Sequence, residues 1–346
     1  MLRYLTAGES HGKGLIAVLE GMPAGLKVEP AAINAELKRR QAGFGRGKRM
    51  QIENDKAEVV SGLRRGISLG SPIALLIKNK DFSIDRLQLV ACPRPGHADL
   101  AGLLKYGFTD ARDVLERASA RSTAATVGIG ALCKILLREF RITLGSGVVS
   151  VGGGKTSKAI KQKIQQAIAH KDTVGGIFEV IARGVPAGLG SYVQPDRRLD
   201  SRLAGAVMSI PGIKAVEIGL GSGYAQKFGS EIHDAIYFSK RKGFYRNTNN
   251  AGGIEGGISN GEDVVLRGCM KPISTLMNPL DSVNIRSRHP AKASVQRSDI
   301  CVVESAGIVA ESAVAYVLAD ALLEKFGGDS LSDIKAGYAR YLKRIR

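Results

Sequence analysis

Residues 92–125, CPRPGHADLAGLLKYGFTDARDVLERASARSTAA, carry a dense group of chemically useful side chains. The two prolines favour extended backbone, so they predict a stiff segment that presents His97 where a loop meets a helix. Histidine is the side chain best suited to exchange protons near neutral pH. Arg117 and Arg121 are four residues apart, so we expect them on one face near the start of the next helix, as in an anion site. Each residue alone fits a solvated surface group, but together they favour a functional site.

The charge balance of the 346-residue chain predicts an anionic partner. Lys and Arg number 50 against 32 Asp and Glu, which gives a net charge of +18. Such a surplus favours nucleic acid or a small substrate that carries phosphate and carboxylate groups. Nucleic-acid sites usually add aromatic side chains that stack on bases. Because aromatic residues make up only 5% of the chain and Trp is absent, we expect a small anion and no nucleic acid.

The remaining composition is typical of a soluble, cytoplasmic protein with 44% hydrophobic and 24% charged residues. The four cysteines are far apart and form no C-x-x-C pair, so we expect no disulfide framework, no zinc site and no metal. The polar run at 8–12 comes too early for a signal peptide. The longest uncharged stretch near the middle, 122–133, is too short to cross a membrane, and no membrane partner is expected.

Hydrophobic periodicity and helix-start signals predict alternating strands and helices. The expected strands lie at 15–19, at two places within 56–78, and at 142–151. The expected helices lie at 30–40, 119–140, 157–170, 305–326 and 332–346. The helix at 119–140 is rich in small residues, which predicts close packing against other helices.

Three segments of the first half return in the second half in the same order. GMPAGL at 21–26 returns as GVPAGL at 184–189, and GLRRGISLG at 62–70 returns as GIEGGISNG at 253–261. HAD at 97–99 and RSD at 297–299 each precede a long Ala-rich helix. The repetition predicts a duplication. We therefore expect one domain, 1–346, with similar halves at about 1–145 and 146–330 and a basic C-terminal helix at 331–346. His97 and the 297–299 segment would then face each other across one cleft.

Four further segments suggest anion chemistry. Residues 152–156, GGGKT, resemble a phosphate-binding loop, but Val149 replaces the required glycine; we interpret the segment as a turn and keep a nucleotide hydrolase as the alternative. In GESHG at 8–12, Ser10 and His11 are adjacent, which suits a catalytic triad poorly and favours His11 as a proton donor to an anion.

The basic loop 39–49 is suited to closing over an anion, although a solvated charge run is the simpler interpretation. KPIST at 271–275 offers a second anion or cofactor phosphate site.

Together these motifs are similar to those of the chorismate synthase family, and the resemblance covers the chain in order. The segments that carry it are 8–12, 39–46, 94–99, 117–121, 252–259, 270–275 and 297–301. The resemblance implies an α+β fold, an internally duplicated β-α-β sandwich with long helices between antiparallel sheets, assembled as a homotetramer. It implies an anti-1,4-elimination of phosphate from 5-enolpyruvylshikimate 3-phosphate to give chorismate. It also implies reduced FMN (FMNH2) as cofactor and leaves NADPH open as its reductant.

The resemblance assigns roles residue by residue. His11 would protonate the departing phosphate, His97 would lie at the N1/C2 carbonyl edge of the flavin, and Asp299 would assist proton removal. The residues implied in substrate or NADP binding are Ser10, Arg40, Arg46, Arg94 and Arg121. Those implied in FMN binding are Arg117, Ala118, Ser119, Gly256, Lys271, Pro272, Ile273, Ser274, Thr275 and Arg297.

The chain departs from the family pattern at two places. Val114-Leu115-Glu116 stands where the family often has glycines, and Ser122 stands where it often has glutamate. The second change removes a negative charge beside Arg121, so the charge network around that arginine is expected to differ.

Overall fold

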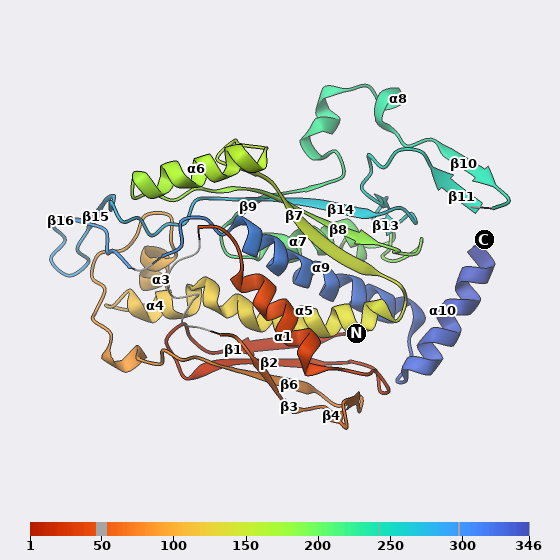
Figure 1. Cartoon of the computed structure of the whole chain (residues 1–346), viewed down its shortest axis with the longest axis horizontal. Helices are drawn as coiled ribbons and strands as arrows, with labels where there is room; N and C mark the ends of the chain where they lie inside the picture. Colours follow the sequence, from red (N-terminus) through yellow and green to blue (C-terminus); the bar gives the residue numbers. More distant parts are fainter. Residues whose placement is uncertain (46–53, 242, 297, 346) are drawn as a thin grey trace.

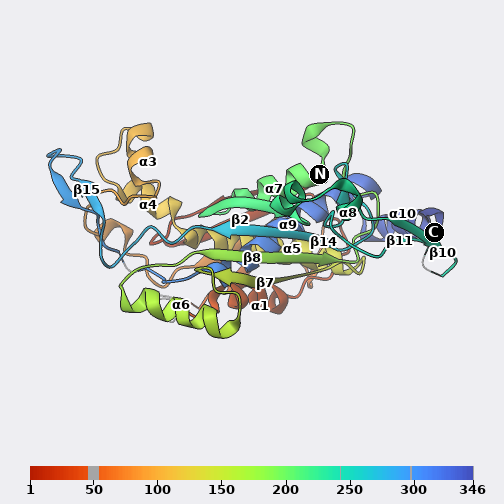
Figure 2. The same ribbon diagram turned by 90° about the horizontal axis from the view of Figure 1, so that it is seen from above.

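Two four-stranded antiparallel sheets enclose a layer of long helices (Figures 1 and 2). The computed structural model describes residues 1–45, 54–241, 243–296 and 298–345. In spatial order the first sheet contains β1 (Arg3–Ala7), β2 (Gly14–Glu20), β6 (Ile73–Lys78) and β3 (Ala57–Ser61). The second contains β7 (Thr143–Val151), β8 (Gly176–Arg183), β14 (Val264–Met270) and β9 (Ile213–Ile218). This arrangement confirms the expected α+β sandwich.

The strand sequences explain which face of each sheet is buried. In β2, Leu15, Ala17 and Leu19 are buried, whereas Ile16 between them is 46% exposed. Successive side chains of a strand point to opposite faces, so this alternation directs one face toward the helices. The strand expected at 15–19 is confirmed by β2, and the strand expected at 142–151 is confirmed by β7. The 56–78 segment contains β3 and β6 and, between them, the short hairpin β4 (Leu63–Arg64) and β5 (Ile67–Ser68).

The helix layer consists of α1 (Pro30–Gln41), α5 (Thr123–Arg138) and α9 (Val303–Phe326), packed between the sheets (Figure 1). The small residues of α5 bring it close to α9. A Cβ added at Gly130 would lie 2.2 Å from Cβ of Ser312, so only glycine permits this approach. The close helix packing expected from the sequence is confirmed.

Two stretches, Arg112–Arg138 and Val303–Phe326, are long and apolar enough to cross a membrane by length and composition alone. In Val303–Phe326, 94% of the most apolar window is buried inside the fold. Burial between two sheets explains this composition without a membrane, because a core helix is apolar on every side.

Shorter elements lie around the sandwich. α3 (Asp99–Tyr106) and the hairpin of β15 (Asp281–Val283) and β16 (Pro290–Lys292) lie at one end, and α10 (Leu331–Ile345) lies at the other (Figures 1 and 2). The remaining elements are α4 (Arg112–Ala118), α6 (Ser157–Ala169), α7 (Leu199–Met208), α8 (Gly229–Ile232), the hairpins β10 (Ile236–Ser239) with β11 (Gly243–Arg246) and β12 (Ile254–Glu255) with β13 (Ile258–Ser259), and the 3-10 turns η1 (Ile84–Arg86), η2 (Ala120–Ser122), η3 (Pro195–Arg197) and η4 (Gly221–Gln226).

The prediction of one helix over 119–140 is wrong at its start. α4 ends at Ala118, Ser119 is extended (φ −66°, ψ 142°), and α5 begins only at Thr123 after the turn η2. The Ser119 hydroxyl accepts a hydrogen bond from the Arg121 amide at 3.3 Å, which caps the turn. Arg117 and Arg121 therefore belong to different elements and do not share a helix face.

The two halves carry one turn that is hydrogen-bonded in the same way. The Ser68 hydroxyl accepts from the Leu26 amide at 2.9 Å and donates to the Pro23 carbonyl at 2.6 Å. In the second half, the hydroxyl of Ser259 accepts from the Leu189 amide at 2.8 Å and donates to a proline carbonyl, that of residue 186, at 2.6 Å. These matched bonds support the division into two similar halves, which stays a prediction.

Candidate functional site

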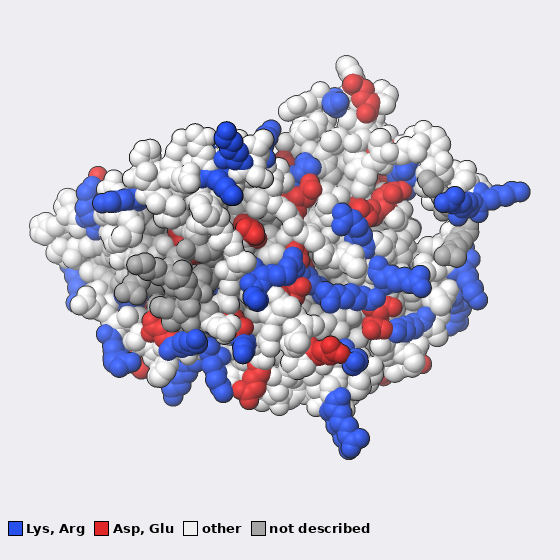
Figure 3. All heavy atoms as spheres, in the orientation of Figure 1, with Lys and Arg blue, Asp and Glu red and all other residues white. Residues whose placement is uncertain are grey.

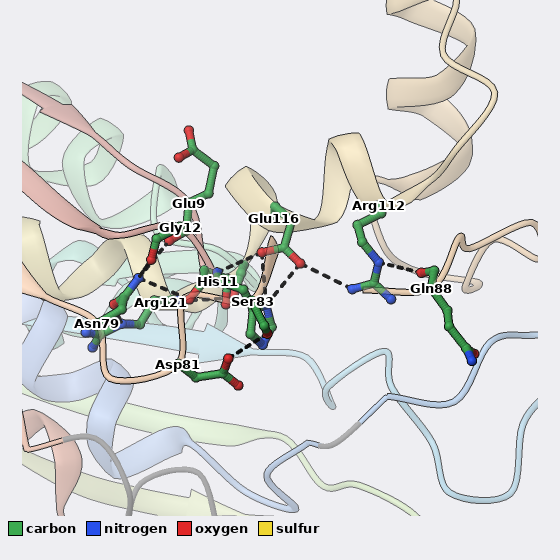
Figure 4. Close-up of polar contacts among 12 residues, drawn as sticks. Glu9, His11, Gly12, Asn79, Asp81, Ser83, Gln88, Arg112, Glu116 and Arg121 are labelled. Atoms are coloured by element: carbon green, nitrogen blue, oxygen red, sulfur yellow. Dashed lines mark hydrogen bonds and ion pairs between the residues drawn. The ribbon is translucent and has the colours of Figure 1, made fainter. Parts of the chain in front are cut away.

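The loop that carries His11 connects β1 to β2. Its entry requires glycine at position 8, where φ is +105° and a Cβ would lie 2.2 Å from the Gly14 carbonyl oxygen. His11 Nδ1 lies 3.0 Å from both carboxylate oxygens of Glu116, and the His11 amide donates to Glu116 Oε2 at 2.8 Å (Figure 4). The imidazole is 19% exposed, so one edge is held by the protein and the other reaches the surface.

Glu116 lies on α4 with its side chain only 2% exposed. Arg112 Nη1 donates to its Oε1 at 3.3 Å. Burial opposes ionisation of Glu116, but hydrogen bonds from His11 and Arg112 outweigh it and lower the pKa of the carboxyl group. An ionised carboxylate only accepts hydrogen bonds, so Nδ1 carries the proton shared with Glu116 and Nε2 is left to meet a partner outside the loop.

Two arginines expected to bind anions meet at one buried carboxylate. Arg40 Nη2 lies 2.9 Å from Asp55 Oδ2, and Arg121 Nη1 lies 2.6 Å from Asp55 Oδ1. Asp55 is fully buried, and the two guanidinium groups are nearly so. Arg121 Nε also donates to Asn79 Oδ1 at 2.9 Å (Figure 4). The amide of Asn79 in turn donates to the carbonyls of the His11 loop, so this ion-pair network is connected to His11.

The segment 117–119 borders the same loop. Arg117 Nη1 donates to the Gly8 carbonyl and Nη2 to the Thr6 carbonyl, both at 2.9 Å. The Ser119 hydroxyl donates to the hydroxyl of the buried Ser10 at 3.3 Å. Ala118, between them, is half-buried. Arg117 therefore reaches an exposed edge of the His11 loop, whereas Arg121 points into the buried network.

His97 forms a second histidine–carboxylate pair. The proline-bounded segment before it is neither helix nor strand, and α3 begins at Asp99, so the expected loop-to-helix junction is confirmed. His97 Nδ1 lies 2.5 Å from Asp99 Oδ1. Arg94 also binds Asp99, with Nε at 2.8 Å from Oδ2 and Nη2 at 3.0 Å from Oδ1. Burial opposes ionisation of Asp99, but these hydrogen bonds outweigh it and hold its pKa well below the usual range.

A segment of the second half lies against the His97 loop. Arg94 Nη1 donates to the Thr275 hydroxyl at 2.7 Å, and the Ser274 hydroxyl donates to the Gly96 carbonyl at 2.7 Å. Lys271 Nζ donates to the same carbonyl and, at 2.7 Å, to the Ser274 hydroxyl. Burial lowers the pKa of Lys271, and the positive charges of Lys214 and Arg94 lower it further. A bound anion would relieve this repulsion between cations.

The other residues implied in cofactor or substrate binding make no described contact with either histidine. Gly256 is in the turn between β12 and β13, which precedes β14, whereas Lys271 directly follows β14. Pro272 is exposed, and the Ile273 carbonyl accepts a hydrogen bond from the Thr173 hydroxyl at 2.7 Å. Arg46 and Arg297 lie outside the described residues.

Asp299 is half-buried before α9. The next residue, Ile300, donates its amide to the Gly45 carbonyl at 2.9 Å, which connects this segment to the one after α1. The His97 loop instead contacts the second half through the segment 271–275 and through Ser282, whose hydroxyl donates to the Pro93 carbonyl at 2.6 Å. The N-cap of α9 is Val302, so Asp299 does not cap this helix.

The other candidates behave as surface features. The histidines outside both pairs are exposed: His170, His233 and His289. Residues 152–156 form a turn in which the Thr156 hydroxyl caps α6 by accepting from the Ala159 amide at 3.2 Å. Among the described residues, no group of three or more His, Cys, Asp or Glu is arranged to hold a metal ion.

Sequence reasoning missed three residues that organise the site: Asp55, Asn79 and Glu116. Each contacts a residue more than ten positions away, and Glu116 lies 105 residues from His11. The departure of residues 114–116 from the family pattern was the only signal, because it placed a charged side chain where small residues are frequent.

Comparisons with known proteins agree with this geometry. The family model described as chorismate synthase matches residues 2–323. A chorismate synthase from Thermoanaerobacter pseudethanolicus is 52% identical over 348 residues, covering 100% of this chain and 99% of the relative. One from Geobacter sulfurreducens is 48% identical over 391 residues, covering 100% of both. A crystal structure of chorismate synthase superposes with a TM-score of 0.82 at 41% identity, covering 99% of this chain and 98% of the other. By sequence and by fold, the chain belongs to the chorismate synthase family of lyases.

Proposed function

We propose that the chain catalyses the anti-1,4-elimination of phosphate from 5-enolpyruvylshikimate 3-phosphate to give chorismate. The C3–O bond breaks and its electron pair leaves with the phosphate, while a proton leaves C6. The observation that carries this proposal is the pair of histidines, each held through Nδ1 by a buried carboxylate and connected to arginines. A leaving phosphate needs a proton and nearby positive charge, and this arrangement supplies both.

In this proposal the two clusters have different tasks. His11 donates its Nε2 proton to the departing phosphate, and Arg117 at the exposed edge of the same loop contributes positive charge. Ser10, Arg40 and Arg121 bind or shape the substrate side, with Arg46 as a further cation. Arg94 and His97 shape the cofactor side, because their loop contacts the segment 271–275. Asp299 assists removal of the C6 proton.

The residues near His97 fit a flavin phosphate and ring edge. Gly96 has φ of +76°, and a Cβ there would lie 3.3 Å from the Ser274 hydroxyl and 3.6 Å from Lys271 Nζ, so glycine keeps this cradle open. Lys271, Ser274 and Thr275 would hold the cofactor from this side. Arg117, Ala118, Ser119, Gly256 and Arg297 complete the proposed set. When bound, reduced FMN supplies reversible electron donation that assists departure of the phosphate.

Two features of the assembly belong to the same proposal. We expect a homotetramer of this 36.7 kDa chain. We also expect the reaction to require reduced FMN bound at the site, although the reaction itself involves no net oxidation or reduction. NADPH is the candidate reductant, with Arg40 and Arg46 as its candidate ligands.

Anaerobic incubation with the enolpyruvyl substrate and chemically reduced FMN tests the proposal. We expect chorismate and inorganic phosphate in equal amounts, and no product with oxidised FMN. A P-loop hydrolase would instead release phosphate from ATP with Mg²⁺ and lose activity in Lys155→Met. A nucleic-acid-binding protein would show affinity that falls steeply with salt. On the face in Figure 3, basic side chains are interspersed with acidic ones, which disfavours a continuous nucleic-acid track.

A further inference from the structure

Glu116 is a buried acid that none of the assigned roles uses. It reaches His11 from α4, which is 105 residues away along the chain. It binds both the amide of His11, at 2.8 Å, and its ring, at 3.0 Å. The Glu116 carbonyl also accepts from the Ser10 amide at 2.9 Å. The last residues of α4 thus hold the backbone and the side chain of His11 together.

The carboxylate of Glu116 is itself fixed from behind. Arg112, one helical turn earlier, donates to Oε1 at 3.3 Å. Arg112 is anchored in turn, because its Nε donates to the Gln88 carbonyl at 2.7 Å (Figure 4). The carboxylate therefore has little freedom to rotate, and neither has the ring edge that it binds.

The opposite side of the loop is held by Asn79. Its Nδ2 lies 2.7 Å from the Gly12 carbonyl and 3.3 Å from the Ser10 carbonyl, on either side of His11. Arg121 fixes the amide orientation by donating to Asn79 Oδ1 at 2.9 Å. Asn79 therefore fixes the backbone of the loop, and Glu116 is the group that orients the imidazole.

The local charges favour a role for Glu116 beyond orientation. Three guanidinium groups surround the loop: Arg112 on Glu116, Arg117 on the Gly8 carbonyl and Arg121 on Asn79. Their positive charge opposes an imidazolium. Glu9 is also acidic, but it is exposed and points away from His11 (Figure 4). Glu116 is the carboxylate in contact with the ring, and a contact pair with little water stabilises both charges.

We propose that Glu116 is the positioning residue of His11, fixing the ring with Nε2 outward and stabilising the imidazolium that acts as the acid. This inference rests on the proposed elimination. As the C3–O bond breaks, the Nε2 proton passes to a phosphate oxygen. The ring becomes neutral, and Nδ1 keeps its proton and its hydrogen bond to Glu116.

Two substitutions of Glu116 separate the effect of its charge from its effect on the orientation of the His11 ring. Glu116→Gln removes the charge but keeps an oxygen that accepts from Nδ1, whereas Glu116→Ala removes both. Asp113→Asn is the matched control, because Asp113 is an exposed acid on the same helix. We expect single-turnover chorismate formation to fall about tenfold or more in both Glu116 variants, and to stay unchanged in the control. The substrate KM should change much less than kcat.

Nitrogen-15 spectra of histidine-labelled, ligand-free protein supply a readout that needs no activity, with His11→Ala identifying the His11 signals. We expect a protonated Nδ1 in the wild type and in Glu116→Gln, and a mixture of tautomers in Glu116→Ala. Wild-type turnover in Glu116→Gln, or an unchanged His11 spectrum in folded Glu116→Ala, would overturn the inference. If Glu116→Ala does not fold, Glu116→Gln decides the outcome. If the wild type forms no chorismate, the proposed function fails, while the spectra still test whether Glu116 fixes the ring.

Discussion

His11 and His97 are held by similar pairs that differ in what their carboxylates bind. Both imidazoles are 19% exposed, and both direct Nδ1 at a buried acid. Asp99 lies two residues from its histidine and also receives two side-chain hydrogen bonds from Arg94, at 2.8 and 3.0 Å. Glu116 is distant in sequence and receives one longer bond from an arginine, at 3.3 Å.

This difference indicates different chemistry at the two rings. Asp99 is shared between His97 and Arg94, and Arg94 Nη2 also lies 3.0 Å from His97 Nδ1. Glu116 instead directs most of its hydrogen-bonding capacity to His11. We therefore expect His11 to act as the acid at the departing phosphate and His97 to act on the cofactor side.

Removal of either ring should have the largest effect. His11→Ala and His97→Ala should each lower chorismate formation by ~10²–10⁴-fold, the range typical of acid–base residues, while circular dichroism stays unchanged. The exposed His170 provides the control, and His170→Ala should retain wild-type turnover. Near-wild-type rates in both site variants would remove the proposed roles.

Asp99→Asn should reveal how strongly the first pair depends on Arg94. The substitution leaves a guanidinium that is only 6% exposed without its carboxylate, which should lower the free energy of unfolding by about 3 kcal/mol. Glu58→Gln breaks an exposed pair with Lys78 and should cost at most about 1 kcal/mol. Urea denaturation measures the free energy of unfolding of both variants. Equal decreases would contradict a larger contribution from the buried ion pair.

Asp299 tests whether a third acid acts outside the two pairs. Asp299→Asn should lower turnover by about tenfold, because an amide cannot accept the C6 proton. Circular dichroism and FMN titration of the same variant should show that it still folds and binds the cofactor. Full turnover in this variant would exclude Asp299 from proton transfer.

The smallest effect should appear in the stability of the folded protein at low pH. Folding lowers the pKa of Glu116, so the folded protein holds its carboxylate ionised at a pH where the unfolded chain has begun to bind a proton. Its contribution to stability is therefore present above about pH 4 and is lost as the pH falls further. In Glu116→Gln the free energy of unfolding should fall less steeply with decreasing pH than in the wild type, by at most about 1.4 kcal/mol per pH unit. Identical slopes in denaturation series at several pH values would contradict the assignment.

The layered fold was predictable because its signals are local. The apolar run at 15–19 and the small residues of α5 are local features, and the strand and the close helix packing predicted from them are confirmed. The break at Ser119 was missed because the extended conformation there depends on tertiary contacts, including the hydrogen bond to Ser10. Helical propensity alone favoured one continuous helix through this position.

The candidate site was predictable only in part for the same reason. His97 and Asp99 are close in sequence, so their pairing follows from the loop-to-helix junction. The pairing of His11 with Glu116 depends on how α4 meets the loop between β1 and β2, and no periodicity in the sequence indicates that contact. Arg40 and Arg121 were expected as anion ligands, but their shared contact with Asp55 required the folded chain.

The affinity for FMN tests most directly whether the two histidine–carboxylate pairs have different roles. The His97 loop contacts Lys271, Ser274 and Thr275, whereas the His11 ring contacts Glu116 on α4. We expect the dissociation constant for reduced FMN to rise about tenfold in His97→Ala, the loss of roughly one hydrogen bond, and to stay unchanged in His11→Ala. Anaerobic titrations of both variants and the wild type would provide these values. Equal weakening in the two variants, or wild-type affinity in His97→Ala, would contradict the assignment of His97 to the cofactor side.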